Sequence, residues 1–225
     1  MNSNKKVRAI ITGTTGMVGD GVLHECLLHP QVEAVLVINR KPCGISHPKL
    51  KEIIHEDFFN FSAIENQLIG YNACFFCLGV SSVGMKEEQY YTLTYTLTMH
   101  TAKTLSKINP DMTFCYVSGA GTDSTEKGRS HWARVKGKTE NGIFGLFKNA
   151  FAFRPGFIKP TAGLKRAHKF YRYINWMFPM LVKFFPNTAN TLREIGLSMI
   201  EVAQEGYEKK IIDPKDIRVL AQKAV

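Results

Sequence analysis

Short apolar runs alternate with segments of helical periodicity along the first 160 residues of the chain. The runs long enough to form strands lie at residues 7–12, 32–38, 50–57, 73–78, 113–118 and 150–154. Between them, helical patterns follow residue 16 and cover residues 61–68, 85–107 and about 130–148. Strands that alternate with helices predict an α/β fold built on a doubly wound parallel sheet.

The segment from Tyr91 to Met99 carries two conflicting signals. Threonines alternate there with large apolar residues, which by period and propensity is typical of a strand. However, the runs at 73–78 and 113–118 can be parallel neighbours only if a crossover connects them, and residues 85–107 must supply it. We therefore predict a helix, because topology outranks the local pattern.

A further helix is predicted from Ser130 to about Lys148. It contains Gly137, Gly142 and Gly145, and glycine in a helix interior is unfavourable. We therefore expect this helix to break near its end.

Three glycines spaced three residues apart follow the first apolar run. Gly13, Gly16 and Gly19 lie between a predicted strand and a helix. A phosphate can lie against bare backbone there, at the positive end of the helix, with no Cβ in its way. The spacing differs from G-x-G-x-x-G, so an ordinary βα turn is the alternative. The strand before and the helix after favour a phosphate site made of Gly13, Thr14, Thr15, Gly16, Met17, Val18 and Gly19.

The ends of the other predicted strands should meet at the same edge of the sheet. In a doubly wound sheet, ligands bind beyond the carboxyl ends of the strands, near the topological switch point. The residues that this rule gathers are Asn39, Arg40, Asp57, Phe58, Leu78, Gly79, Ser118, Gly119, Arg154, Pro155 and Gly156. Their convergence with the glycine turn is stronger evidence for a nucleotide site than any single motif.

The second strand ends on Asn39-Arg40, where a site that prefers NAD usually has a carboxylate for the ribose hydroxyls. A guanidinium can instead grip a 2′-phosphate with two charge-assisted hydrogen bonds. We therefore favour NADP (NADPH) over NAD as the cofactor; a solvated loop charge is the alternative for Arg40. Asp57 and Phe58 flank the adenine in this hypothesis, but Asp57 is equally suited to cap a helix that begins near Phe61.

Length and composition point to one domain. The 225 residues fit a single α/β unit, in which residues 160–225 add a small, mostly helical, substrate-side lid and terminal helices. The five cysteines are odd in number and mostly fall in predicted strands or helices, which favours a reducing, cytoplasmic location. Cys74 and Cys77 have a metal-like spacing, but an odd separation on a strand places the sulfurs on opposite faces, so we expect no metal site.

The net charge of +10 favours anionic partners. No nucleic-acid motif accompanies the basic residues of the second half, and we interpret most of them as a solvated face. The aromatic stretch 171–185 is too short to span a bilayer, and a packed cap or homodimer face is the favoured interpretation. Peripheral membrane contact stays open.

Several of these residues occur together in a known family. The three-glycine opening, Cys77-Leu78-Gly79, Ser118, Val135-Lys136-Gly137 and Phe153-Arg154-Pro155-Gly156 resemble the atypical short-chain dehydrogenase/reductases. The sequence looks most like their Tat-interactive-protein oxidoreductase-like branch, also described as nucleoside-diphosphate-sugar epimerases. The resemblance covers residues 6 to 160 and implies a Rossmann-like fold that binds NAD(P)H.

The resemblance also implies a catalytic serine, tyrosine and lysine. Ser118 matches the serine, which polarises a carbonyl, and Lys136 matches the lysine, which holds the nicotinamide ribose. The tyrosine position is occupied by Trp132, whose indole N–H donates a hydrogen bond but is no usable acid or base near neutral pH. Nearby residues that titrate are His131, Tyr90 and Tyr91, and none is distinguished beyond its proximity.

Two functions follow as hypotheses, beside a third in which the basic, aromatic second half of the chain binds a membrane or nucleic-acid surface. One is an NADPH-dependent oxidoreductase or epimerase-like enzyme acting on a small carbonyl or sugar-nucleotide substrate. The other is a catalytically impaired NADPH-binding regulator or sensor, because Trp132 stands where the family has its tyrosine. Of these hypotheses, the sequence favours the enzyme.

Overall fold

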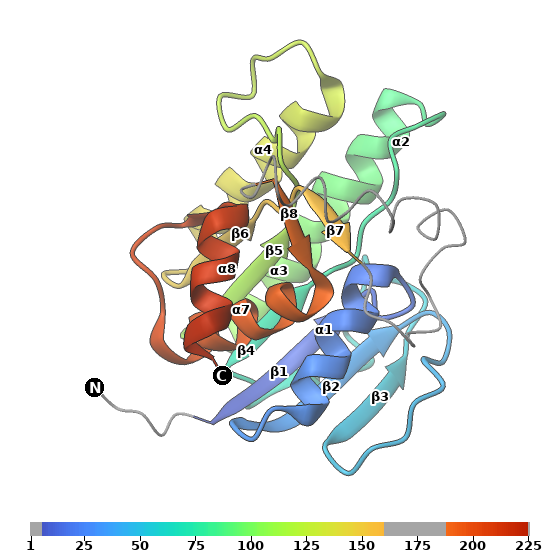
Figure 1. Cartoon of the computed structure of the whole chain (residues 1–225). Coiled ribbons are helices and arrows are strands. Elements are labelled where there is room, and N and C mark those ends of the chain that lie inside the picture. The colour runs from blue at the N-terminus through green and yellow to red at the C-terminus, as the bar shows by residue number, and fades with distance from the viewer. Residues whose placement is uncertain (1–5, 160–187, 225) are drawn as a thin grey trace.

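The computed structural model describes residues 6–159 and 188–224. Seven parallel strands form the central sheet in the order β3-β2-β1-β4-β5-β6-β9 (Figure 1). Their bounds are Val7–Thr12 for β1, Val32–Asn39 for β2, Leu50–Ile54 for β3, Ala73–Phe76 for β4, Thr113–Val117 for β5, Ala150–Phe153 for β6 and Ile211–Ile212 for β9. The predicted doubly wound parallel sheet is confirmed, and the predicted strands at 50–57, 73–78, 113–118 and 150–154 end one to three residues earlier than expected.

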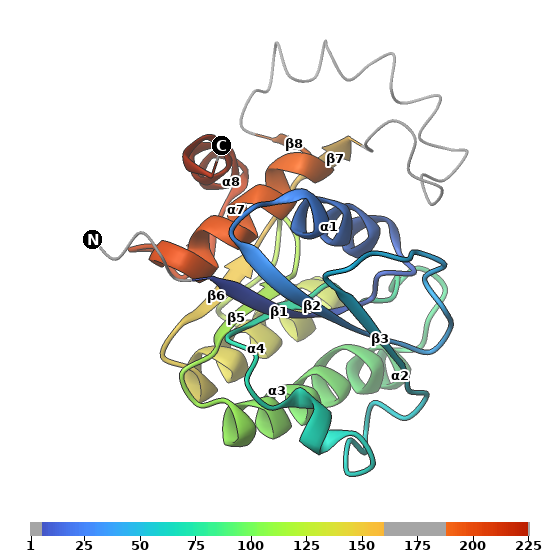
Figure 2. The same ribbon diagram turned by 90° about the horizontal axis from the view of Figure 1, so that it is seen from below.

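Helices cover both faces of this sheet (Figure 2). On one face lie α1 (Met17–Leu28), α7 (Leu192–Glu205) and α8 (Pro214–Lys223), and on the other α3 (Leu97–Ile108) and α4 (His131–Leu146). Neighbouring strand residues point to opposite layers: Ile11 and Phe75 pack under α1 and α7, whereas Ile10 packs under α3 and α4. Cys74 and Cys77 likewise belong to opposite layers, as the strand period predicted.

The crossover between β4 and β5 is helical, as topology required. It consists of α2 (Glu87–Tyr91), a π-helical turn (Thr92–Thr96) and α3. The buried residues of this crossover recur at helical spacing, which the strict alternation of residue types conceals. They are Tyr90, Thr94, Leu97, Thr98 and Thr101. The hydroxyls of Thr98 and Thr101 donate to the carbonyls four residues earlier, so these buried side chains are satisfied inside the helix.

Helix α4 runs without a break to Leu146, so the expected break near its glycines is wrong. Two of these glycines are sites of close packing. A Cβ on Gly137 would lie 2.5 Å from the backbone carbon of Asp123, and one on Gly142 would lie 2.7 Å from the sulfur of Met99. Tertiary contacts at these positions offset the low helix propensity of glycine.

The segment predicted as a helix at 61–68 forms only a 3₁₀ turn, Glu65–Leu68. Asp57 therefore caps no helix near Phe61; its carboxylate accepts the backbone N–H of Phe59 at 2.9 Å and closes a local turn.

Beyond β6, a small two-stranded parallel sheet joins β7 (Phe157–Lys159) to β8 (Ala189–Thr191). The C-terminal helices are present as predicted, and α7 packs into the core layer beside α1. Of the segment 160–225 that was predicted to supply a lid, residues 160–187, including the aromatic stretch 171–185, lie outside the described residues. In residues 6–159 and 188–224, no helix combines the length and the apolar content that a bilayer crossing needs.

Candidate functional site

The glycine turn after β1 meets the end of β4 at the switch point of the sheet. Gly13 has a φ of +74°, and a Cβ there would lie 2.7 Å from the backbone of Cys77 and Leu78. A Cβ on Gly19 would lie 2.5 Å from the carbonyl carbon of Gly13. These two glycines let the turn, the helix and the neighbouring strand approach one another closely.

Gly16 has a different role. It is exposed, and a Cβ there would come no nearer than 3.4 Å to protein atoms. It also begins α1 without a side-chain cap, so the N–H groups of the first helical turn point outward at the positive end of the helix dipole. Gly16 therefore presents bare backbone to whatever lies above the sheet edge.

A cleft of about 650 Å³ opens at this point. We call it the glycine cleft. Residues from the glycine turn and from the ends of β4, β5 and β6 line it, together with two residues of α4 and one of β7: Gly16, Met17, Val18, Cys77, Leu78, Gly79, Val80, Ser81, Val117, Ser118, Gly119, Ala120, Trp132, Lys136, Pro155, Gly156 and Ile158. Nine of the predicted site residues thus share one wall: Gly16, Met17, Val18, Leu78, Gly79, Ser118, Lys136, Pro155 and Gly156.

A smaller pocket of about 150 Å³ adjoins the cleft, because Leu78, Gly79 and Val80 line both. We call it the Arg40 pocket. Its other lining residues come from the loops after β2 and β3 and from the crossover, and are Arg40, Glu56, Asp57, Phe58, Phe59, Leu93 and Leu97. The structure therefore brings the predicted residues Arg40, Asp57 and Phe58 together, next to the cleft.

The other predicted residues line neither cavity. Gly13, Thr14 and Gly19 are buried beneath the turn, and Thr15 is exposed at its tip. Asn39 is buried and donates to the hydroxyl of Thr14 at 2.6 Å and to the carboxylate of Glu52 at 3.1 Å. It holds the glycine turn against β2 and β3 and lines neither cavity.

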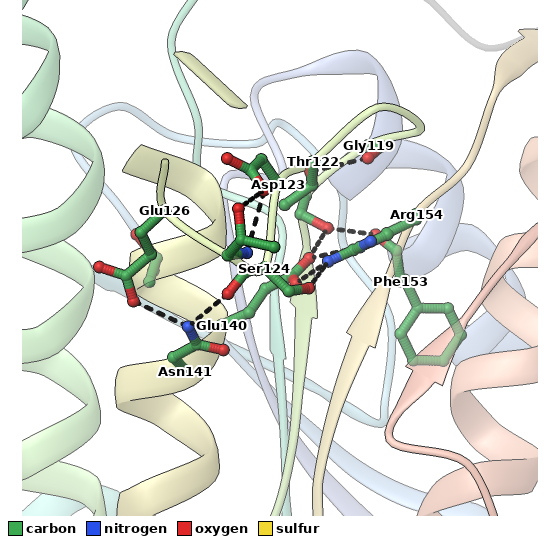
Figure 3. A network of polar contacts seen from close by, with 12 residues as sticks. Gly119, Thr122, Asp123, Ser124, Glu126, Glu140, Asn141, Phe153 and Arg154 are labelled. Carbon is green, nitrogen blue, oxygen red and sulfur yellow. Dashed lines mark hydrogen bonds and ion pairs between the residues drawn. The ribbon is translucent and has the colours of Figure 1, made fainter. Parts of the chain in front are cut away.

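Arg154 points away from the cleft and toward α4. Its guanidinium makes a forked ion pair with the carboxylate of Glu140, at 3.0 Å and 2.5 Å, and also donates to the hydroxyl of Ser124 (Figure 3). Glu140 is fully buried, so this paired guanidinium is what compensates its charge.

Ser118 belongs to the same network. Its hydroxyl lies 2.5 Å from a carboxylate oxygen of Glu140 and 3.2 Å from the carbonyl oxygen of Phe153. Both neighbours are acceptors, so the single hydroxyl proton is directed inward and the Ser118 oxygen presents its lone pairs to the cleft. The predicted polarisation of a carbonyl requires that proton, which Glu140 holds in this arrangement.

Glu140 was missed by the sequence analysis. It connects Ser118 after β5, Arg154 after β6 and helix α4. The spacing Lys136-x-x-x-Glu140 was the available signal, because residues four apart share one helix face.

Lys136 lies on the cleft wall, one helical turn before Glu140. Its ammonium group donates a hydrogen bond to the backbone carbonyl of Ser118. Burial lowers the pKa of Lys136 to about 8, although the Glu140 carboxylate acts to raise it. Gly137, the next residue, has no Cβ and so lets the loop backbone at Asp123 cross the helix closely. The Asp123 carboxylate accepts hydrogen bonds from the backbone N–H groups of Thr125 and Gly128, which fixes that loop.

Of the nearby titratable residues, none of the three considered from the sequence lines the cleft. Both ring nitrogens of His131 face oxygen atoms of Glu87, at 2.5 Å and 3.1 Å. Tyr90 is buried against the His131 ring, and Tyr91 lies outside α4 beneath Lys138. Trp132 does line the cleft.

The fold has many known counterparts. The structure superposes on ADP-L-glycero-D-manno-heptose-6-epimerase of Helicobacter pylori with a TM-score of 0.64 and 14% identity, covering 99% of this chain and 84% of that one. For dTDP-glucose 4,6-dehydratase DesIV of Streptomyces venezuelae, solved with NAD bound, the TM-score is 0.67 at 12% identity, over 96% and 80% of the two chains. For a short-chain dehydrogenase/reductase superfamily protein of Agrobacterium tumefaciens, also solved with bound NAD, the TM-score is 0.64 at 13% identity, covering 96% of this chain and 81% of that one. The chain has the fold of the short-chain dehydrogenase/reductases.

At these identities the likeness shows the fold alone, and it confirms the Rossmann-like fold that the family resemblance implied. No protein-family model matches the chain. Among curated proteins, leucinostatins biosynthesis cluster protein T of Purpureocillium lilacinum is 28% identical over 140 residues, which are 61% of this chain and 51% of that protein. The matched region thus covers about half the length of that relative.

Proposed function

We propose that this protein is an NAD(P)(H)-binding oxidoreductase or epimerase-like protein that acts on a carbonyl or sugar-nucleotide substrate. One observation carries the proposal: a side-chain-free surface at Gly16 lies on a cleft that continues into the Arg40 pocket on one side and reaches Ser118 and Lys136 on the other. A dinucleotide needs this order of sites, with an adenosine site, a pyrophosphate site and a site for the reactive ring.

The residues fit the cofactor along this line. The N–H groups of Met17 and Val18 would bind the pyrophosphate at the start of α1. The Arg40 pocket would take the adenosine, and Lys136 would contact the nicotinamide ribose. The bound nicotinamide supplies or accepts a hydride, which is the chemistry that the protein's own side chains lack.

Arg40 favours NADP over NAD in this proposal. It is exposed at the mouth of its pocket, where its charge-assisted hydrogen bonds would meet a 2′-phosphate. Glu56 and Asp57 line the same pocket, and their negative charges would repel a 2′-phosphate. The preference for NADP over NAD therefore requires that Arg40 lies nearer to the phosphate than these two carboxylates.

The structural relatives support the substrate class. Two of the structurally similar proteins, the ADP-L-glycero-D-manno-heptose-6-epimerase and the dTDP-glucose 4,6-dehydratase, are named for sugar-nucleotide substrates. By analogy, a small-molecule substrate would enter the glycine cleft beside Trp132 and Ser118. A homodimer and a cytoplasmic location stay predictions.

The test is a calorimetric titration of the protein with NADPH and with NADH, followed by their oxidation against a panel of carbonyl compounds and sugar nucleotides. We expect binding of both, with NADPH tighter, and oxidation with at least one substrate. If neither dinucleotide binds, the proposal is wrong.

The second candidate is an NADPH-binding regulator without turnover, favoured by Trp132 at the tyrosine position. If the wild type oxidises NADPH with no compound while Trp132→Tyr gains carbonyl reduction, this candidate is supported. Turnover by the wild type excludes it.

A further inference from the structure

The wall of the glycine cleft holds few groups that can exchange a proton. Among its described lining residues, only Cys77 and Lys136 have side chains that titrate below pH 12 or near it. Burial raises the pKa of the Cys77 thiol to about 12, so it stays protonated at any ordinary pH and is a poor acid. Lys136 is the remaining group.

Within residues 6–159 and 188–224, the side chains considered as replacements for the missing tyrosine are held elsewhere. His131 is bound at both ring nitrogens by Glu87, and Tyr90 is buried, with burial raising its pKa. The proton of Ser118 is directed to Glu140. Trp132 only donates a hydrogen bond.

We propose that Lys136 itself moves the proton in this protein, and that Glu140 is the positioning residue that keeps Ser118 out of that role. The proposal rests on the proposed function, since it assigns the proton step of the same reaction. It gives the cleft a donor that needs no aromatic hydroxyl, which explains how a tryptophan can stand at position 132.

The hydrogen-bond inventory of Lys136 allows this. An ammonium group has three N–H bonds, and the carbonyl of Ser118 accepts one of them. No other acceptor for this ammonium is found among the described residues, which leaves two N–H bonds for the cleft, one for a ribose hydroxyl and one for the substrate oxygen. Glu140 sits one turn away and is neutralised by Arg154, so no carboxylate pairs directly with the ammonium among the described residues.

The step is balanced in both directions. In reduction, the substrate carbon gains the hydride, an Nζ–H bond of Lys136 breaks, and an O–H bond forms on the substrate oxygen. The neutral amine then regains a proton from water. In oxidation, the neutral amine takes the hydroxyl proton as the hydride leaves the carbon for the oxidised cofactor.

Opposite pH profiles follow from this scheme. Reduction needs the ammonium, so kcat should fall as the pH rises through the pKa of Lys136, near 8. Oxidation of the matching alcohol needs the amine, so kcat should rise through the same value. Removing a general acid or base lowers kcat by roughly 100-fold or more. Lys136→Arg keeps the charge but does not titrate, so its kcat should fall by at least that factor and should no longer change with pH near 8 in either direction of the reaction.

A measurement without turnover accompanies the kinetics. The protein is labelled with trace acetic anhydride from pH 6 to 11, and acetylation at each lysine is quantified by peptide mass spectrometry. Lys136 should titrate near pH 8, more than one unit below the exposed lysines, and NADPH should protect it. If Lys136 titrates with the exposed lysines, or stays unlabelled up to pH 11, the proposal is overturned.

Two variants separate this role from a structural one. Glu140→Gln removes the negative charge that raises the pKa of Lys136, so both kinetic limbs and the labelling curve should move to lower pH. Lys138→Gln, two residues along on the same helix but stacked outside on Tyr91 and Tyr95, should leave them in place. If Glu140→Gln does not fold, the wild-type labelling curve and the kinetics of Lys136→Arg still test whether Lys136 moves the proton.

The proposed function and this inference fail differently. If no dinucleotide binds, the proposed function is wrong. If NADPH binds and a carbonyl is reduced, but Lys136→Arg retains kcat within about threefold or the alkaline limb is absent, only the role of Lys136 is wrong.

Discussion

The three glycines after β1 make different contributions, and exchanging each for alanine should separate them. At Gly16 the new methyl group would meet only the carbonyl oxygen of Gly13, at 3.4 Å, and the backbone angles there (φ −99°, ψ 165°) are allowed for alanine. The fold should therefore lose only about 1 kcal/mol, the typical cost of alanine at a helix N-cap.

The same methyl group would project from the wall of the glycine cleft. A pyrophosphate pushed away from this surface loses hydrogen bonds to the first N–H groups of α1, each worth about 1.5–3 kcal/mol because the acceptor is charged. Two such bonds give at least about 3 kcal/mol, so Gly16→Ala should weaken NADPH binding by roughly 100-fold or more.

Gly19→Ala is the matched comparison. Its Cβ would lie 2.5 Å from the carbonyl carbon of Gly13 and 2.8 Å from the nitrogen of Thr14. These are backbone atoms that cannot rotate away, so this variant should lose about 2 kcal/mol or more of unfolding free energy.

Urea denaturation and calorimetry with NADPH measure the two effects on the same samples. We expect Gly16→Ala to be stable and to bind poorly, and Gly19→Ala to be destabilised. A Gly16→Ala protein that binds NADPH within threefold of the wild type, on the scale of tenfold per 1.4 kcal/mol, would refute the placement of the pyrophosphate.

Three other variants or conditions test neighbouring parts of the molecule. Arg40→Gln should raise the Kd for NADPH by about 10-fold or more and leave that for NADH unchanged, because a charged hydrogen bond is worth about 1.5–3 kcal/mol; an equal effect on both dinucleotides would contradict the role of Arg40. Glu140→Ala should lower the unfolding free energy by about 3 kcal/mol in urea, because Arg154, whose side chain is only 17% exposed, loses its partner. Adding Arg154→Met should recover part of that loss, and purely additive costs would show that the ion pair is not coupled. Above pH 9 stability should fall with rising pH, because burial raises the pKa values of Cys26, Cys74, Cys77 and Cys115 and their thiols ionise only on unfolding; each contributes about 1.4 kcal/mol per pH unit, and Cys115→Ala should flatten the decline.

The sequence by itself determined the architecture of this protein. Its apolar runs and the need for a crossover between β4 and β5 were enough to predict the parallel sheet and the helix over Tyr91 to Met99, because connectivity in a parallel sheet is a geometric requirement. The same argument placed the glycine turn, Arg40 and Ser118 at one edge, and the family resemblance added Lys136. Local patterns failed where packing overrides propensity, as at Gly137 and Gly142 in the unbroken helix α4.

Only the tertiary structure decided which of these residues face the cleft. Asn39 and Arg154 stand at strand ends as Arg40 and Ser118 do, yet their side chains turn to Thr14 and to Glu140. Glu140 is separated from both of its partners in sequence and has no signal except its helical spacing from Lys136. Such choices depend on which buried polar groups can satisfy one another in three dimensions, since an unpaired buried charge is too costly to keep, and that is not written in any local segment of the chain.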